Sequence, residues 1–279
     1  MAILLALLSA VCYGTGDFSA GLASRRYTAA PVTAAVTALG AVLACLAVLI
    51  GGARAPDAAE LLWGALSGVG SAVGTFALYH GLSVGRMSVV ATLSAILTAV
   101  IPALLGVALG NRLGVVAAAG IVIAIPAIAL VSWQPAEHRE TGQRSGVRFG
   151  VIAGLGFALL LIALDRAGTR AGAWPLVPGE GIAVLLLLPV ALRGVAGHGH
   201  PTRSAAGLTA LAGTLAGTGN LLYLAATGHG QLAVVAVLTA LYPAMTVILA
   251  RTVLAEHWTR RQIAGLISAA LAVILVSAR

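Results

Sequence analysis

The sequence predicts an all-α integral membrane protein with ten transmembrane helices, arranged as two inverted five-helix repeats. Three observations lead to this fold class. Hydrophobic residues make up 60% of the 279 residues, and charged residues make up only 9%. The apolar residues form ten long continuous runs, and the end of the first half of the chain recurs at the end of the second half.

The composition excludes several other classes of protein. Soluble domains carry roughly 25% charged residues, so this chain has too few charges to cover a surface in water. Disordered chains are poor in apolar residues. The 16 basic residues are all arginine and are scattered thinly through apolar sequence, whereas nucleic-acid binding requires a dense basic face. We therefore expect the lipid bilayer, and no nucleic acid, as a partner of the chain.

Polar breaks divide the chain into runs of about 20 residues, which is the length that a membrane-spanning helix requires. The first run has no basic segment before it, so we expect it to remain as the first helix rather than to be an export signal. Cys12 and Cys45 both lie inside runs and offer neither a disulfide framework nor a metal-ligand spacing. The predicted helices cover residues 2–22, 31–51, 61–80, 87–109, 113–132, 149–165, 174–192, 205–226, 231–254 and 262–278.

An internal repeat organises these helices. Residues 85–134 align without gaps with residues 230–279, a shift of 145 residues, and 16 of the 50 positions are identical. Each copy holds five helices, an odd number, so the second copy must enter the membrane from the opposite side, as in many secondary transporters. We expect a first repeat at 1–134, a polar linker at 135–145 and a second repeat at 146–279.

Three short patterns accompany this layout. They are Tyr13-Gly14-Thr15-Gly16-Asp17-Phe18 in the first helix, Thr239-Ala240-Leu241-Tyr242-Pro243 in the ninth, and Leu254-Ala255-Glu256-His257-Trp258-Thr259 in the turn that follows. Together with the two repeats, they resemble the drug/metabolite transporter superfamily, EamA type. The first repeat departs from the pattern, with Asn111 at the position of Glu256 and Thr98 at that of Pro243. The resemblance implies a ten-helix carrier that moves small metabolites or drugs by alternating access.

Asp17 is the leading candidate for the transport site, because a charged side chain within a span is costly and is a functional suspect. In one interpretation it faces a central cavity and binds a substrate amine or a coupling proton. In the other it is an interfacial carboxylate that pairs with Arg25 or Arg26, about two turns further along the helix. The sequence leaves both interpretations open.

Other polar side chains in or beside the spans are further candidates. Glu180 opens the seventh helix, where the helix dipole alone also favours a carboxylate. Tyr79, Asn220 and Tyr223 either hydrogen-bond a substrate or satisfy a neighbouring backbone, and His80 either binds a ligand or extends to the interface. The candidates for substrate or proton binding are Asp17, Tyr13, Tyr79, His80, Asn220, Tyr223 and Glu180.

Small residues, a proline and helix-end charges are candidates for packing and gating. Gly74 and Gly217 belong to glycine rows at helical spacing in the third and eighth spans, a pattern that lets helices approach closely. Pro243 frees a backbone carbonyl and kinks the ninth helix. Glu256 belongs to a charge cluster that ends the ninth helix. The full set is Arg25, Arg26, Gly74, Gly217, Pro243 and Glu256.

The leading functional hypothesis is a secondary-active transporter of the inner or plasma membrane that exports small metabolites or drugs, with or without proton coupling. The alternatives are an intramembrane enzyme acting on lipid or peptide, an uncoupled facilitator, and a scaffold. Intramembrane chemistry needs paired carboxylates or a His/Glu cluster at one depth, and the sequence shows no such motif. We expect no enzyme activity, no cofactor and no metal, a small-molecule substrate, and a monomer or homodimer.

The orientation in the membrane stays open. Ten arginines fall in the connections on the side of the linker and five on the other side, so the positive-inside rule places the linker in the cytoplasm. The family resemblance implies the reverse, with both termini in the cytoplasm.

Overall fold

The computed structural model describes residues 1–52, 54–84, 87–131, 146–195, 201–254 and 259–277, and all of its regular structure within them is α-helix. The prediction of an all-helical membrane chain is therefore confirmed for these residues. Six helices, α1, α2, α3, α6, α7 and α8, are long and apolar enough to cross a membrane, and shorter apolar helices accompany them. The helices are α1 (Ala2–Arg26), α2 (Ala29–Gly51), α3 (Ala58–Val84), α4 (Met87–Ala108), α5 (Val115–Val131), α6 (Val147–Ala167), α7 (Leu176–Val195), α8 (Arg203–Thr227), α9 (Leu232–Thr239), α10 (Tyr242–Leu254) and α11 (Arg260–Ser277).

The helix boundaries repeat along the chain at the shift that the sequence shows. Four pairs of helices begin 145 residues apart: α1 and α6 at 2 and 147, α3 and α8 at 58 and 203, α4 and α9 at 87 and 232, and α5 and α11 at 115 and 260. The repeat that is visible in residues 85–134 and 230–279 therefore extends to the helices upstream of it.

The ninth predicted helix differs from the expectation. The sequence predicts one continuous helix over 231–254, but the structure divides this segment into α9 and α10, with Ala240 and Leu241 in a turn between them. Pro243 lacks an N–H and cannot donate to the Thr239 carbonyl four residues earlier. The chain turns instead, and the Ala244 N–H donates to the Leu241 carbonyl at 2.9 Å.

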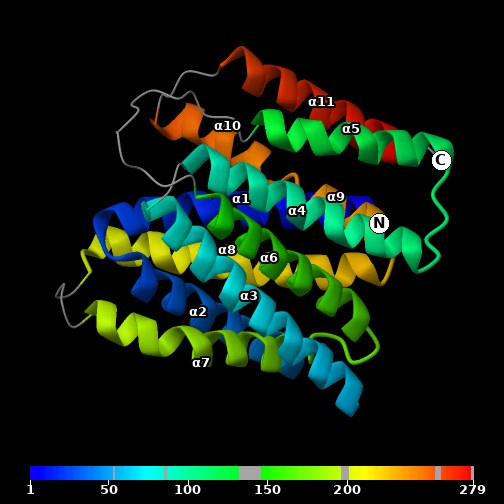
Figure 1. Cartoon of the computed structure of the whole chain (residues 1–279). Coiled ribbons are helices and arrows are strands. Elements are labelled where there is room, and N and C mark those ends of the chain that lie inside the picture. The colour runs from blue at the N-terminus through cyan, green and yellow to red at the C-terminus, as the bar shows by residue number, and fades with distance from the viewer. Residues whose placement is uncertain (53, 85–86, 132–145, 196–200, 255–258, 278–279) are drawn as a thin grey trace.

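The helices form two units, α1–α5 and α6–α11, which pack on each other reciprocally. The third helix of each unit packs along the first helix of the other, so that α3 lies on α6 and α8 on α1, while α2 packs on α7. The fifth helices, α5 and α11, lie side by side at one edge of the bundle (Figure 1). The described ends of the chain lie at the same end of the bundle (Figure 1).

The α5–α11 contact shows the reciprocity in detail. A Cβ on Gly120 would lie 2.7 Å from Cγ2 of Val276, and a Cβ on Gly265 would lie 2.6 Å from the backbone nitrogen of Val131. At the 145-residue shift, Gly120 corresponds to Gly265 and Val131 corresponds to Val276, so each glycine meets the valine of the other helix. Equivalent contacts made in both directions are typical of similar units that face each other across a two-fold axis.

A charged residue at the start of α3 is explained locally. Glu60 is buried, but its carboxylate accepts from the Asp57 N–H at 2.8 Å and pairs with Arg54 at 2.9 Å. The Glu60 N–H donates back to the Asp57 carboxylate at 2.8 Å. This reciprocal arrangement is a capping box, so Glu60 has a structural role.

Glycines set the closest approach between the units. A Cβ on Gly156 of α6 would lie 2.5 Å from the Gly74 nitrogen and 2.8 Å from the Gly70 carbonyl oxygen of α3. Real Cβ contacts are longer than this, so only glycine permits the observed approach of α3 to α6. At the middle of the bundle, α9 is buried at every position except Val234.

The α3–α6 contact is tested by adding a single methyl group. Gly156→Ala is expected to lower the free energy of unfolding by about 1–3 kcal/mol, because the methyl group meets backbone atoms that cannot move aside. Thermal unfolding in detergent measures the change. Gly181→Ala on α7 is the matched control, because nothing lies within 4 Å of the added Cβ there. Equal unfolding temperatures for the two variants would contradict the packing argument.

Candidate functional site

A cavity of about 110 Å³ lies between the two units and is the candidate functional site. This volume is large enough for several water molecules. Twenty of the described residues line it, and they come from α1–α4, α6–α10 and the α9–α10 turn. None of its lining residues comes from α5 or α11, which pack on each other. The first four helices of each unit therefore build the site together.

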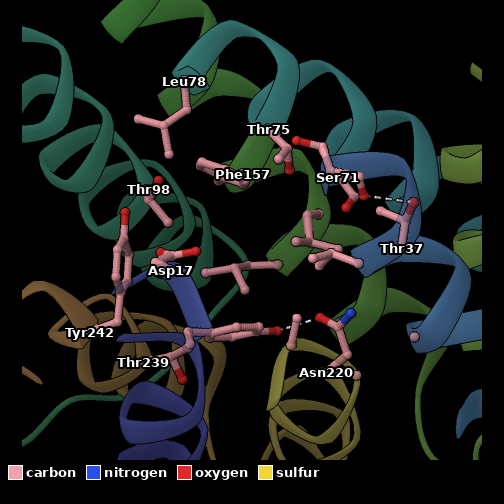
Figure 2. Close-up of a pocket in the computed structure, with 18 of the residues that line it drawn as sticks. Asp17, Thr37, Ser71, Thr75, Leu78, Thr98, Phe157, Asn220, Thr239 and Tyr242 are labelled. Atoms are coloured by element: carbon pink, nitrogen blue, oxygen red, sulfur yellow. Dashed lines mark hydrogen bonds between the residues drawn. The ribbon is translucent and has the colours of Figure 1, made fainter. Parts of the chain in front are cut away.

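Helix α1 presents two polar side chains to the cavity. Tyr13 and Asp17 are four residues apart, so they lie on one face of the helix one turn from each other. Figure 2 shows Asp17 beside Thr98 of α4 and Tyr242 of α10. Among the described residues, no side chain or backbone group donates a hydrogen bond to Asp17, and no basic side chain pairs with it. Its carboxylate is thus open to a ligand in the cavity.

A chain of hydrogen bonds holds the second carboxylate. Glu180 on α7 is only 7% exposed, and its Oε1 accepts from Nδ2 of Asn220 on α8 at 2.6 Å. The Tyr13 hydroxyl donates to the Oδ1 of the same amide, as the dashed line in Figure 2 shows. The amide of Asn220 therefore connects α1, α7 and α8, which come from both units.

Missing side chains make room for this carboxylate. A Cβ on Gly40 of α2 would lie 2.9 Å from the carboxyl carbon of Glu180. A Cβ on Gly217 of α8 would lie 3.0 Å from the Cα of Gly40. Both glycines line the cavity. Larger residues at these two positions would push Glu180 out of its place or separate α2 from α8.

The cavity wall is rich in hydrogen-bond acceptors. Several hydroxyl groups already donate to the backbone of their own helix: Thr33 donates to the Ala29 carbonyl at 2.9 Å, Thr37 to the Ala34 carbonyl at 3.0 Å, and Thr98 to the Ser94 carbonyl at 2.8 Å. Because their protons are already used, these hydroxyl groups can only accept hydrogen bonds from a ligand in the cavity. Like the two carboxylates, these groups suit a ligand that brings its own N–H donors.

Aromatic rings complete the wall, and the described lining residues include no arginine, lysine or histidine. Tyr13, Phe157 and Tyr242 all face the cavity, and aromatic faces attract organic cations. The described residues hold no cluster of three or more His, Cys, Asp or Glu side chains that could bind a metal ion. The arrangement can hold an ammonium group or protons.

The structure brings five of the predicted residues to the cavity: Asp17, Tyr13, Asn220, Glu180 and Gly217. Of the two interpretations of Asp17, its place in the cavity agrees with the first. Arg26 is exposed and donates to Ser204 of α8. The side chain of Arg25 lies outside the described residues.

Other predicted residues lie elsewhere. Tyr223 is fully buried away from the cavity, and its hydroxyl donates to the Leu161 carbonyl at 2.9 Å. His80 is exposed near the end of α3, Gly74 lies against the ring of Phe157, and Pro243 lies in the first turn of α10. The side chain of Tyr79 and all of Glu256 are outside the described residues.

Several lining residues are not conspicuous in the sequence. The hydroxyl-bearing ones occur as pairs four residues apart, Thr33 with Thr37 on α2 and Ser71 with Thr75 on α3. This spacing places each pair on one helix face, which is a signal that the sequence does contain. It is weak alone, since threonines in apolar helices commonly bond to their own backbone. Phe157 has no such signal, and Tyr242 appears in the sequence only as part of the Thr239–Pro243 pattern, which does not place it in a cavity.

Comparisons with known proteins agree with the fold. A family model described as EamA-like transporter family matches residues 1–133 and 144–278. Among 21 matching chains of solved structures, one described as "Crystal structure of protein" aligns with a TM-score of 0.79. That alignment covers 99% of this chain and 96% of the other at 15% sequence identity, and this likeness shows the shared fold. No curated protein matches.

The Asn220 amide is expected to stabilise the bundle. Asn220→Ala removes the donor to Glu180 and the acceptor for Tyr13, so the free energy of unfolding should fall by about 1–3 kcal/mol. Thermal unfolding in detergent measures it. Thr214→Ala on the same helix is the control, because that exposed hydroxyl donates only to the Ala210 carbonyl. If Asn220→Ala unfolds at the same temperature as Thr214→Ala, the hydrogen-bond chain does not contribute to stability.

Proposed function

We propose, from the premise that the chain belongs to the EamA-like transporter family, that it is a secondary carrier that exports small amines across the plasma membrane in exchange for protons. The membership makes it a multi-pass membrane transporter. The substrate class, the direction and the exchange are our proposal. The observation that carries it is the pair of carboxylates, Asp17 and Glu180, in one cavity between the two units.

The chemistry of the cavity supports a cationic substrate. A carboxylate in a low-dielectric site is costly unless a positive charge or a proton compensates for it. Neither Asp17 nor Glu180 pairs with a basic side chain among the described residues. The compensating charge must then come from outside, as a proton or as an ammonium group of the substrate.

This requirement couples the two ligands. A carboxyl group that holds a proton cannot pair with an ammonium group, so the proton and the amine compete for the same oxygens. A proton gradient then drives the amine in the opposite direction, provided that the cavity opens to one side at a time. Asp17, Glu180, Tyr13 and Tyr242 are the titratable groups of the described wall. Of these, the two carboxyl groups exchange the protons.

Alternating access follows from the repeat architecture. We assign the first unit to residues 1–134, the linker to 135–145 and the second unit to 146–279, with ten spans in total. The two units insert in opposite orientations, and α9 with α10 forms one span that is broken at the cavity. Secondary transporters of this design bind substrate near the midplane beside discontinuous helices, and one unit rocks against the other. The cavity between these two units fits that design.

The carboxylates are tested by transport in proteoliposomes. With butyltrimethylammonium on one side and a proton gradient across the membrane, the wild type should exchange the cation for protons. Asp17→Asn and Glu180→Gln should each lower the rate by at least about tenfold, because each removes a negative charge that compensates for the cation in a low-dielectric site. The affinity of the wild type should rise with pH, as protons leave the carboxyl groups.

Asp57→Asn is the control for this experiment, since Asp57 is exposed just before α3 and does not line the cavity. It should transport like the wild type. Unchanged exchange in both cavity variants, or affinity that falls as pH rises, would contradict the role of the two carboxylates.

The break between α9 and α10 is tested separately. In Pro243→Ala the new N–H can donate to the Thr239 carbonyl and continue the helix through the turn. The exchange rate should fall severalfold while the affinity stays within about twofold, because binding and opening depend on different groups. Pro189→Ala, which restores an N–H inside α7 at an exposed position, is the control. Equal rates for the two variants would show that the break does not take part in the cycle.

A further inference from the structure

A second cavity, of about 250 Å³, lies between α2, α3 and α7 and has no role in the exchange described above. We name it the vestibule. Its walls come from Ala29, Ala30 and Thr33 of α2, Phe76 and His80 of α3, and Leu187 and Val190 of α7. All of these side chains except Thr33 and His80 are apolar.

The vestibule adjoins the central cavity. Thr33 lines both of them, so the two spaces meet at this side chain. Along α2, the central cavity extends from Gly40, which faces the Glu180 carboxylate, to Thr33, which is seven residues or about 10 Å away. The vestibule begins at Thr33 and continues to Ala29, about 6 Å further. A linear molecule could therefore occupy both spaces at once.

The walls of the vestibule suit an apolar chain. Small side chains on α2 leave the space, and Leu187 of α7 is buried beside it. At the outer rim, the rings of Phe76 and His80 stack in parallel with centroids 5.8 Å apart, and the Phe149 ring meets His80 edge-on at 4.9 Å. These flat surfaces can cover a hydrocarbon chain.

Charge fixes the direction in which such a molecule would lie. The two carboxylates are in the central cavity, whereas exposed arginines, Arg26 of α1 and Arg193 of α7, occur in the last turns of helices at the end of the bundle where the vestibule lies. A positive head group is attracted to the first place and repelled from the second. The head group then lies at the carboxylates and the chain extends past Thr33.

We propose that the vestibule binds the apolar arm of the transported amine, so that the substrates are amphipathic amines whose arm reaches at least about 10 Å from the ammonium group. This inference rests on the proposed function for its cationic head group. The vestibule adds selectivity for the length and apolar character of the arm.

The experiment compares the binding of octyltrimethylammonium and dodecyltrimethylammonium to purified protein by calorimetry. An octyl chain ends near Thr33, about 10 Å from the ammonium group, so the four added methylenes of the dodecyl chain should enter the vestibule. Each buried methylene strengthens binding by roughly fourfold, so the affinity ratio of dodecyl to octyl can reach roughly 200 in the wild type.

Val190→Trp fills the vestibule from α7 and should lower that affinity ratio by roughly tenfold or more, the loss of about two buried methylenes. Ala30→Phe fills it from the opposite wall and should do the same, which keeps the test valid if one variant fails to fold. Leu186→Trp is the matched control, because this exposed position on α7 does not line the vestibule. It should keep the wild-type ratio.

Two outcomes would overturn the proposal. One is a dodecyl-to-octyl ratio that is the same in Val190→Trp, Ala30→Phe and Leu186→Trp. The other is that native mass spectrometry finds a phospholipid that both filling variants release while the ratio stays constant, which would assign the vestibule to a lipid chain. Failure of the proposed function looks different, because butyltrimethylammonium would then bind equally well to Asp17→Asn and to the wild type.

Discussion

The close approach of helices from opposite units is the interaction on which the rest of the structure depends. Lipid tails are as apolar as leucine, so helices in a membrane associate through packing and hydrogen bonds rather than through the hydrophobic effect. Here the contacts of Gly156 with Gly70 and Gly74 leave no space for a single methyl group, and a Cβ on Gly217 would lie tightly against Gly40, 3.0 Å from its Cα. These contacts hold α3 on α6 and α2 on α8, and the cavity is the space that remains between the helices so placed.

The packing is nearly symmetric, but the chemistry inside it is not. At the 145-residue shift, Asp17 of α1 corresponds to Ile162 of α6, and α2, the counterpart of α7, contains no acidic residue to match Glu180. Each unit therefore contributes one acidic residue that its partner unit lacks, on α1 and on α7. Only the second is held by Asn220. In the proposed mechanism, this arrangement would give the carrier equivalent halves for its movement and two unlike carboxylates for binding, one held by Asn220 and one open to ligand.

Much of the fold could be predicted from the sequence, because in a membrane the apolar run itself is the structural element. The runs, the 145-residue repeat and the membrane class all follow from it. The break at Ala240 and Leu241 could not be placed, because Pro102 lies inside α4 without ending that helix, so a proline alone does not decide between a kink and a break.

The site was predictable where a residue was conspicuous in apolar sequence, as Asp17, Glu180 and Asn220 are. The site was not predictable where the residue type was ordinary and only its place in the fold decided whether it lines the cavity. Tyr13 is half-buried and Tyr223 fully buried, and the first bonds to the Asn220 amide at the cavity whereas the second bonds to a backbone carbonyl. The side chain that a tyrosine meets depends on which helix of the other unit lies opposite, and a single sequence does not contain that information.

The same hydrogen bonds that stabilise the helices also decide what the cavity accepts. The hydroxyl groups of Thr33, Thr37 and Thr98 donate to carbonyl groups of their own helices, and the Tyr13 hydroxyl donates to Asn220. The oxygens of these four hydroxyl groups are therefore available to the cavity only as acceptors. A solute with a carboxylate would add negative charge beside Asp17 and Glu180, and no basic side chain among the described lining residues could compensate for it. Under the proposed function, selection for amines over acids would come as much from the rejection of the wrong solute as from attraction to the right one.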